Sequence, residues 1–309
     1  MIDLTKLYAD YLIALGGGDC TAWAAYREIV QQSQKFAGKE RDPHRLYVTD
    51  VSKCRRAIAY RLLGAKRAPL SAAKRIMFRQ SEDIEWHVAA ACLFAGILED
   101  YQFTVVIRDR KNWGGRGDIG LKGGTILEVK TMRSNAFQGS RGDDIPKPAH
   151  EAQVSVYHMY RCDTPDPILL YVDRGGANPP VQVEITPTAS HVVRNWMDEC
   201  DSVRSGVVNG GPLPDLPPMR LFRKAAREST INLGGFTINW SGEVWYGPDW
   251  NCSDAYCDFV DCPNKRVGGA TMLCKMTQKK PLELTSAGTA MKDELLDYLA
   301  SGAKEQSVQ

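Results

Sequence analysis

The spacing of apolar and polar residues divides the chain into helical and extended segments. Helical periodicity predicts helices over residues 1–38, 54–64, 72–97, 148–161 and 187–208. Short runs rich in valine, isoleucine and tyrosine predict strands at 101–108, 168–172 and 181–185. Because strands and helices alternate, we expect an α/β fold with a mixed central sheet flanked by helices.

The segment from Gly115 to Lys130, GRGDIGLKGGTILEVK, predicts a hairpin with charged residues on both arms. Side chains alternate between the two faces of a strand, so Glu128 and Lys130 project together with Ile126. The opposite face is free to enter a core and carries Thr125, Leu127 and Val129.

The predicted hairpin also contains a second carboxylate, that of Asp118. If residues 122–124 form a three-residue loop, Asp118 lies directly opposite Glu128, with Cβ atoms roughly 5 Å apart. Two carboxylates and the Lys130 ammonium on one face can hold a divalent cation and position a water beside it. Similar hairpins occur on ordinary sheet surfaces, where the charges face water, so the hairpin alone does not establish a metal site.

A polar pair lies beyond the hairpin, in the predicted helix at 148–161. Gln153 and Tyr157 are four residues apart and therefore share a helical face. The hairpin followed by this Q-x-x-x-Y helix resembles the RecB-like branch of the PD-(D/E)XK nuclease superfamily. That branch includes the nuclease domains of RecB and AddB and the CRISPR-associated RecB-like exonucleases.

The resemblance implies a restriction-endonuclease-like core and a metal-dependent deoxyribonuclease. In this branch the aspartate and glutamate bind metal, and the lysine orients or activates the attacking water. It implies that Asp118, Glu128 and the backbone carbonyl of Val129 bind Mg²⁺ or Mn²⁺, with Lys130 beside the water. Gln153 and Tyr157 would support the site and the DNA strand. Single-stranded DNA ends are the expected partner, and exonuclease action is the expected activity.

A further metal ligand usually precedes the hairpin in this superfamily, within G-x-x-x-H or G-x-x-x-E. Here Ser81 stands where glycine is expected, and Glu85 lies beyond it at the matching spacing. His87 has the chemical type typical of the closest families. Glu85 and His87 lie about 200° apart on a helix, so both cannot reach one metal ion. Spacing favours Glu85, and His87 is the alternative.

Three of the nine cysteines cluster near the end of the chain. Cys252, Cys257 and Cys262 are separated by four residues each, which suggests thiolate ligation of a metal or cluster. The spacing differs from the common zinc knuckle. The resemblance implies a [4Fe–4S] cluster with Cys54 as its fourth ligand. The family's terminal spacing is more often C-x-x-C-x5-C, so zinc with Cys274, or no metal, stays an alternative.

Composition restricts the class of protein without identifying it. Among 309 residues, 43% are hydrophobic and 25% charged, which is typical of globular proteins. The net charge of +2 indicates that any surface for phosphate must be local. The candidate phosphate contacts are Arg55, Arg56, Arg133 and Lys147. The first residues contain no export signal and no membrane span, so we expect a cytoplasmic protein without membrane partners.

These observations predict three regions. Residues 1–50 form a helical N-terminal extension. Residues 51–265 form the nuclease domain with its cysteine clamp and include a β-like insertion at 212–250. Residues 266–309 form a tail with a terminal helix. The core thus has a helical N-terminal part and a C-terminal part that carries Cys252, Cys257 and Cys262. A homo-oligomer is compatible with this organisation. The alternative function is a non-catalytic DNA-end-binding protein of the same fold, holding iron–sulfur or zinc.

Overall fold

The computed structural model describes most of the first two-thirds of the chain in full. The described ranges are 2–35, 42–134, 137, 145–161 and 164–214, followed by the backbone of short strands between 220 and 284. The chain forms two compact units, one of residues 1–63 and 70–213 and the other of residues 64–69 and 214–309. Within the described residues, no helix is both long and apolar enough to span a bilayer.

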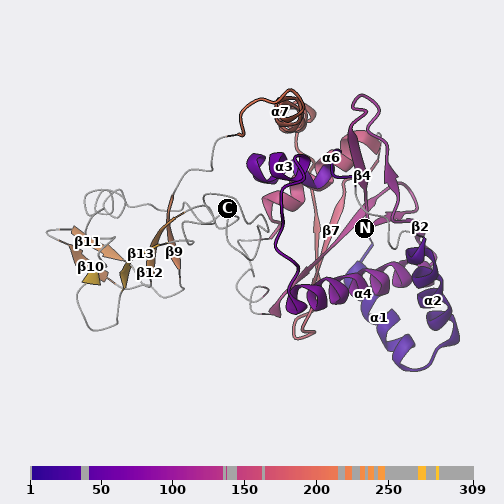
Figure 1. Cartoon of the computed structure of the whole chain (residues 1–309). Helices are drawn as coiled ribbons and strands as arrows, with labels where there is room; N and C mark the ends of the chain where they lie inside the picture. Colours follow the sequence, from indigo (N-terminus) through magenta and orange to yellow (C-terminus); the bar gives the residue numbers. More distant parts are fainter. Residues whose placement is uncertain are drawn as a thin grey trace. The chain divides into compact units, whose positions relative to one another are not determined.

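A five-stranded mixed sheet organises the first unit (Figure 1). Its spatial order is β2 (Leu98–Tyr101), β5 (Ile119–Leu121), β6 (Ile126–Met132), β7 (Ile168–Asp173) and β8 (Val181–Glu184). Within this sheet, β6 and β7 are the one parallel pair among the described strands, and the helix α6 (Pro148–Arg161) lies between them in the chain. Parallel neighbours require such a crossover. The sheet and its flanking helices confirm the expected α/β class.

The hairpin between β5 and β6 has the predicted three-residue loop. The Leu121 N–H donates to the Thr125 carbonyl at 2.9 Å, and the Gly124 N–H donates to the Leu121 carbonyl at 3.0 Å. Gly123 and Gly124 both have φ of 87°, a conformation that favours glycine. Ile119 therefore pairs with Leu127 and Gly120 with Ile126.

One face of the sheet packs against three helices that precede it in the chain. These are α1 (Leu4–Gly16), α2 (Cys20–Gln34) and α4 (Ala72–Phe94), which Figure 1 shows below the sheet. Leu127 and Val129 enter the core on this side, as their alternation predicts. The sequence predicts one helical region over 1–38, and the structure has two helices because Asp19 caps a new one. The predicted end of α4 near Gly96 is confirmed.

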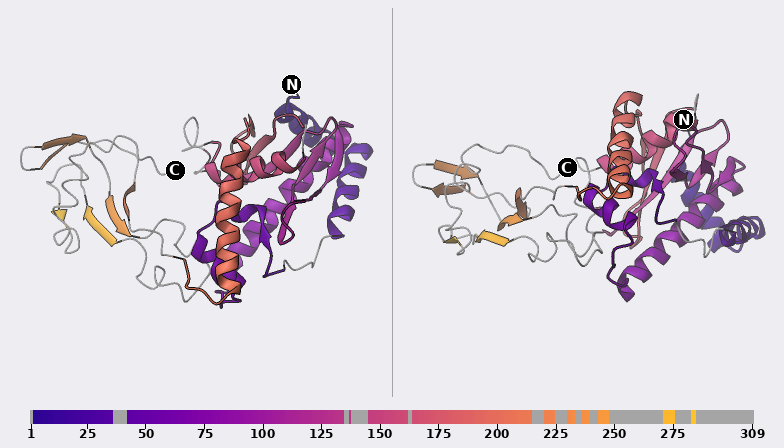
Figure 2. Two further views of the ribbon diagram at one scale, coloured as in Figure 1. Left: turned by 90° about the horizontal axis from the view of Figure 1, so that it is seen from above. Right: turned by 45° about the horizontal axis from the view of Figure 1, so that its top comes forward.

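The opposite face is covered by α6, and α7 (Ser190–Val208) packs on α6 and on α3 (Arg55–Leu62). Ile126 of β6 packs on this side with Val156 and Tyr157 of α6. A small sheet of β1 (Leu46–Tyr47), β4 (Trp113–Arg116) and β3 (Thr104–Val105) adjoins it, and the turn η1 (Val48–Asp50) comes directly after β1. Figure 2 shows α7 alongside α3 in both views.

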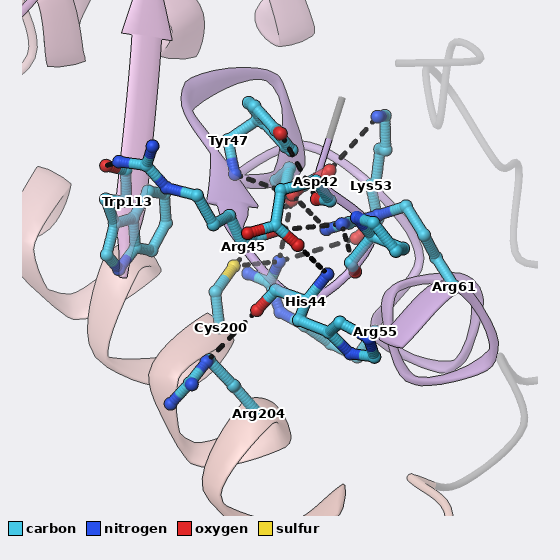
Figure 3. A network of polar contacts seen from close by, with 12 residues as sticks. Asp42, His44, Arg45, Tyr47, Lys53, Arg55, Arg61, Trp113, Cys200 and Arg204 are labelled. Carbon is cyan, nitrogen blue, oxygen red and sulfur yellow. Dashed lines mark hydrogen bonds and ion pairs between the residues drawn. The ribbon is translucent and has the colours of Figure 1, made fainter. Parts of the chain in front are cut away.

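A buried aspartate fixes the segment between β1 and α3. Asp50 is fully buried, and its carboxylate accepts from Arg61 at 2.6 Å, Lys53 at 3.0 Å and the Tyr47 N–H at 2.8 Å. Arg55 extends this network to Glu199 of α7 at 2.7 Å. Figure 3 shows Arg55 beside Lys53 and Arg61 of the same network. Since a buried carboxylate is costly unless paired, this network anchors the segment that carries Cys54.

The predicted strand at 101–108 is divided by a backbone break at Gln102. Gln102 has φ of 50°, which ends β2 after Tyr101, and β3 begins at Thr104 in the other sheet. The Gln102 N–H donates to the Asp118 carbonyl at 2.7 Å. The break thereby ties this segment to the start of the hairpin.

The second unit contains two small antiparallel sheets. One has the order β14 (Glu283–Leu284), β13 (Thr271–Lys275), β12 (Glu243–Gly247) and β9 (Arg220–Lys224). The other pairs β10 (Thr230–Leu233) with β11 (Phe236–Asn239). These strands agree with the predicted β character of residues 212–250. The predicted terminal helix lies outside the described residues.

We predict that Gly117→Ala destabilises the first unit by about 1–3 kcal/mol, as overpacking does. An added Cβ would lie 2.6 Å from Cε1 of Phe103, a buried ring capped at 4.3 Å by the Arg161 guanidinium. Urea unfolding measures the difference. The control is Gly206→Ala in α7, where a Cβ meets nothing within 4 Å and which we expect to gain about 0.5–1 kcal/mol. Equal stability of Gly117→Ala and wild type would contradict the prediction.

Candidate active site

The centre of the candidate site is the buried carboxylate of Glu128 on β6. Its side chain is only 2% exposed, which is rare for a charged residue. The Lys130 ammonium donates to Glu128 Oε1 at 2.7 Å, and the Gln153 amide donates to the same oxygen at 2.6 Å. Glu128 and Lys130 lie on one face of β6, as predicted, and α6 supplies the glutamine that covers them.

Gln153 and Tyr157 connect this carboxylate to the hairpin. The Gln153 carbonyl oxygen accepts from Lys130 at 2.9 Å, while its amide nitrogen also donates to the Tyr157 hydroxyl at 2.9 Å. Tyr157 in turn donates to the backbone carbonyl of Arg116 at 2.8 Å. The two residues share one helical face, as their spacing predicts, and their hydrogen bonds fix the lysine in place.

Asp118 lies at the start of the hairpin, beside the central carboxylate. Continuing the β5–β6 register by one residue sets Asp118 across from Glu128, and Asp118 Oδ2 accepts from the Val129 N–H at 3.0 Å. Burial raises the pKa of Asp118 well above its ordinary value, and the negative charges of Glu128 and Glu85 raise it further. The carboxyl groups of Asp118, Glu128 and Glu85 therefore lie close enough to disfavour one another's charged forms.

Glu85 approaches the same point from α4. Its Oε1 accepts from the Tyr101 hydroxyl at 3.1 Å and from the Gln102 amide at 3.0 Å. Burial raises the pKa of Glu85, the bonds from Gln102 and Tyr101 oppose the rise, and the charge of Glu128 adds to it. The structure thus brings Glu85 into electrostatic contact with the hairpin carboxylates.

His87, the alternative to Glu85, lies elsewhere on α4. Its ring stacks on Tyr26 of α2 with centroids 4.6 Å apart, and its Nδ1 is 3.5 Å from the Tyr11 hydroxyl of α1. Burial lowers its pKa. His87 therefore belongs to the contact between α4 and the first two helices.

Ser81, which stands where the resemblance expects glycine, contacts β6 through its hydroxyl. Its hydroxyl donates to the Met77 carbonyl at 2.9 Å and lies 2.7 Å from the Thr131 hydroxyl of β6. A side-chain hydrogen bond thus joins helix and strand one turn before Glu85.

Lys130 places a positive charge among the carboxylates of Glu85, Asp118 and Glu128. Burial alone would lower its pKa, but the charges of Glu128 and Asp118 raise it above its ordinary value. Lys130 is therefore a fixed ammonium rather than a neutral amine.

The donor set has the chemistry of a hard-cation site. Glu128 Oε2 is buried and has no hydrogen-bond partner among the described residues, and Mg²⁺ and Mn²⁺ prefer such carboxylate oxygens. As the side chains stand, no three His, Cys, Asp or Glu residues in the described part of the chain form a group that could hold a metal ion. The residues fit a divalent cation in charge and donor type.

The predicted cluster ligands are only partly described. Cys54 precedes the first residue of α3 as its N-cap and is a half-buried free thiol. Cys252, Cys257 and Cys262 lie outside the described residues, and Cys274 lies in β13, of which only the backbone is described.

The four candidate phosphate contacts differ in their surroundings. The Arg55 guanidinium is held by Glu199 and by the carbonyls of Asp50 and Val51, so it serves the packing of α3 on α7. Arg56 lies over the Tyr60 ring, 5.8 Å from its centroid. Arg133 is exposed and Lys147 half-buried.

Tyr101 and Gln102 are site residues that sequence reasoning missed. Both bind Glu85, and the Gln102 amide also donates to the Tyr101 hydroxyl at 3.2 Å. Gln102 Oε1 is buried and has no partner among the described residues. The adjacent polar pair at the start of an apolar strand is the only local signal for them, and it is equally typical of ordinary strand alternation.

Comparisons with known proteins found no matching family model and no matching curated protein. Among solved structures, the alkaline exonuclease LHK-Exo from Laribacter hongkongensis in complex with dAMP is 11% identical with a TM-score of 0.41. The match covers 54% of this chain and 89% of that one. Another LHK-Exo structure has the same coverage and identity with a TM-score of 0.39. The crystal structure of SSO0001 is 15% identical, covers 58% and 84%, and has a TM-score of 0.36.

We predict that Asp118→Asn stabilises the metal-free protein, and more so as pH rises. Because the folded-state pKa of Asp118 is raised, the folded protein keeps a proton that the unfolded chain has lost. Wild-type stability therefore falls as pH rises from the unfolded pKa to the folded one. Asparagine does not ionise and can still accept from Val129.

Urea unfolding in a chelating buffer between about pH 5 and about pH 8 measures this difference in the free energy of unfolding. Lys122→Ala in the hairpin loop is the control, since its side chain is exposed. A stability difference that does not change with pH, or a less stable Asp118→Asn at every pH, would contradict the prediction.

Proposed function

We propose that this chain is a metal-dependent deoxyribonuclease of the RecB-like PD-(D/E)XK type, acting as an exonuclease. One observation carries the proposal. Hydrogen bonds of 2.6–2.9 Å join Glu128 and Lys130 of the hairpin to Gln153 and Tyr157 of α6. Asp118 lies across the hairpin from Glu128 and accepts from the Val129 N–H at 3.0 Å.

We assign the cation, Mg²⁺ or Mn²⁺, to Asp118, Glu128 and the Val129 carbonyl, with Glu85 as the further ligand. Glu85 is preferred over His87 because its charge couples to Glu128, whereas His87 stacks on Tyr26. Such a cation, when bound, polarises a phosphate oxygen and lowers the pKa of a bound water.

The protein side chains have separate roles in this proposal. Lys130 keeps its proton, so it steadies the attacking water and the developing negative charge as a fixed positive group. Gln153 orients that ammonium through a 2.9 Å hydrogen bond, which makes it a positioning residue. Tyr157 fixes Gln153 and the Arg116 carbonyl, and so couples α6 to the hairpin.

The finer features rest on the resemblance. Iron–sulfur members of the RecB-like branch commonly act on single-stranded ends, and we extend that preference to this chain. We also propose a structural [4Fe–4S] cluster held by Cys54, Cys252, Cys257 and Cys262. Iron, sulfide and zinc analysis of anaerobically purified protein decides between this cluster and zinc bound with Cys274.

The catalytic assignment predicts that Lys130→Ala and Asp118→Ala each lower Mg²⁺-dependent degradation of end-labelled DNA by at least about 100-fold, the scale of a lost electrostatic stabiliser. Single-turnover rates measure the loss. Lys122→Ala, an exposed lysine in the same hairpin, is the matched control and retains the wild-type rate.

Thermal unfolding separates lost chemistry from lost folding in each variant. Cleavage by folded Lys130→Ala at the wild-type rate would overturn the assignment. Metal and DNA binding by wild type without any cleavage would favour the alternative, a non-catalytic DNA-end-binding protein.

A further inference from the structure

A pocket of about 460 Å³ opens beside the small sheet, next to the candidate active site. Its volume is within the ~300–1,000 Å³ typical of small-ligand sites. It lies among β1, η1, β3 and β4, with one residue of α6. Its lining includes Tyr47, Thr49, Val106, Lys111, Arg116 and Tyr157.

The charge of this pocket is entirely positive. Four lining residues are basic and none is acidic. Arg110 is neutralised by ion pairs with Asp198 and Asp201 of α7. Arg45 is directed to the Trp113 carbonyl at 2.5 Å (Figure 3). Lys111 is exposed and is the positive group best placed to meet an anion.

The rest of the lining is apolar and aromatic. Val106 is 61% exposed and lies between the buried Val105 and Ile107. Tyr47 adds a half-buried ring. Thr49 Oγ1 is buried without a hydrogen-bond partner among the described residues, so the pocket also holds an unused polar group.

The pocket and the candidate site share two residues. Tyr157 lines the pocket and donates to the Arg116 carbonyl, while its hydroxyl accepts from Gln153, which binds Glu128. Arg116 lies two residues before Asp118 in the chain. A strand that reaches the carboxylates can therefore continue into the pocket.

We propose that this pocket binds one unpaired nucleotide of a nucleic-acid strand that also occupies the candidate active site. Lys111 meets its phosphate, and Tyr47 and Val106 contact its base. Positive groups with an aromatic and apolar wall are what single-stranded nucleic acids require, because every base has a face that can stack. The inference rests on the proposed function and extends it to a substrate-binding subsite.

The test measures binding of a fluorescein-labelled single-stranded oligodeoxynucleotide by anisotropy, in chelating buffer, over a range of salt. Lys111→Glu should weaken binding at least about tenfold at low salt and reduce the salt slope by roughly one. Val106→Ser should weaken binding about threefold without changing that slope, since it removes apolar contact alone. Lys122→Glu, the same charge reversal outside the pocket, should bind as wild type does.

The outcomes separate this subsite from the proposed chemistry. If wild type degrades DNA while Lys111→Glu and Val106→Ser bind as wild type does, the pocket assignment fails and the nuclease assignment stands. If those variants lose binding but wild type never cleaves, the pocket stands and the nuclease assignment fails. Equal affinity for duplex and single-stranded DNA, or equal loss in Lys122→Glu, would also overturn the pocket assignment.

Discussion

The candidate site depends on the burial of one carboxylate, that of Glu128. An ionised carboxylate in a protein interior is unstable unless it is paired and hydrogen-bonded. Lys130 and Gln153 stabilise one oxygen of Glu128, and the other oxygen is left without a partner among the described residues. Asp118 and Glu85 lie nearby, where burial and the negative charge of Glu128 raise the pKa of each. A bound cation would offset the negative charge of these carboxylates. The electrostatics of the site and the proposed chemistry therefore both depend on the same buried carboxylates.

Much of this arrangement could be predicted because it is set by local rules. The alternation of side chains along a strand places Glu128 and Leu127 on opposite faces of β6. Gly123 and Gly124 can adopt the positive φ that the loop requires. Helical spacing joins Gln153 to Tyr157. Each rule acts over a few residues, which is why the predicted hairpin register and Gln/Tyr face agree with the structure.

Other parts depend on contacts between distant segments. The break at Gln102, which brings Tyr101 and Gln102 to Glu85, is set by the bond to the Asp118 carbonyl, and nothing nearby in the sequence encodes it. Arg55 has the sequence context of a phosphate contact, yet its partner Glu199 is 144 residues away. The choice between Glu85 and His87 likewise needs the tyrosines of α1 and α2, whose packing no helical spacing within α4 reveals.

The most direct test is calorimetric titration of Mn²⁺ into the metal-free protein and into Glu128→Gln, which keeps the side-chain shape and removes the charge. We expect wild type to bind Mn²⁺ and Glu128→Gln to bind at least about tenfold more weakly, a difference of about 1.4 kcal/mol. Equal affinity in the two proteins, or no binding by wild type, would contradict a metal site centred on Glu128.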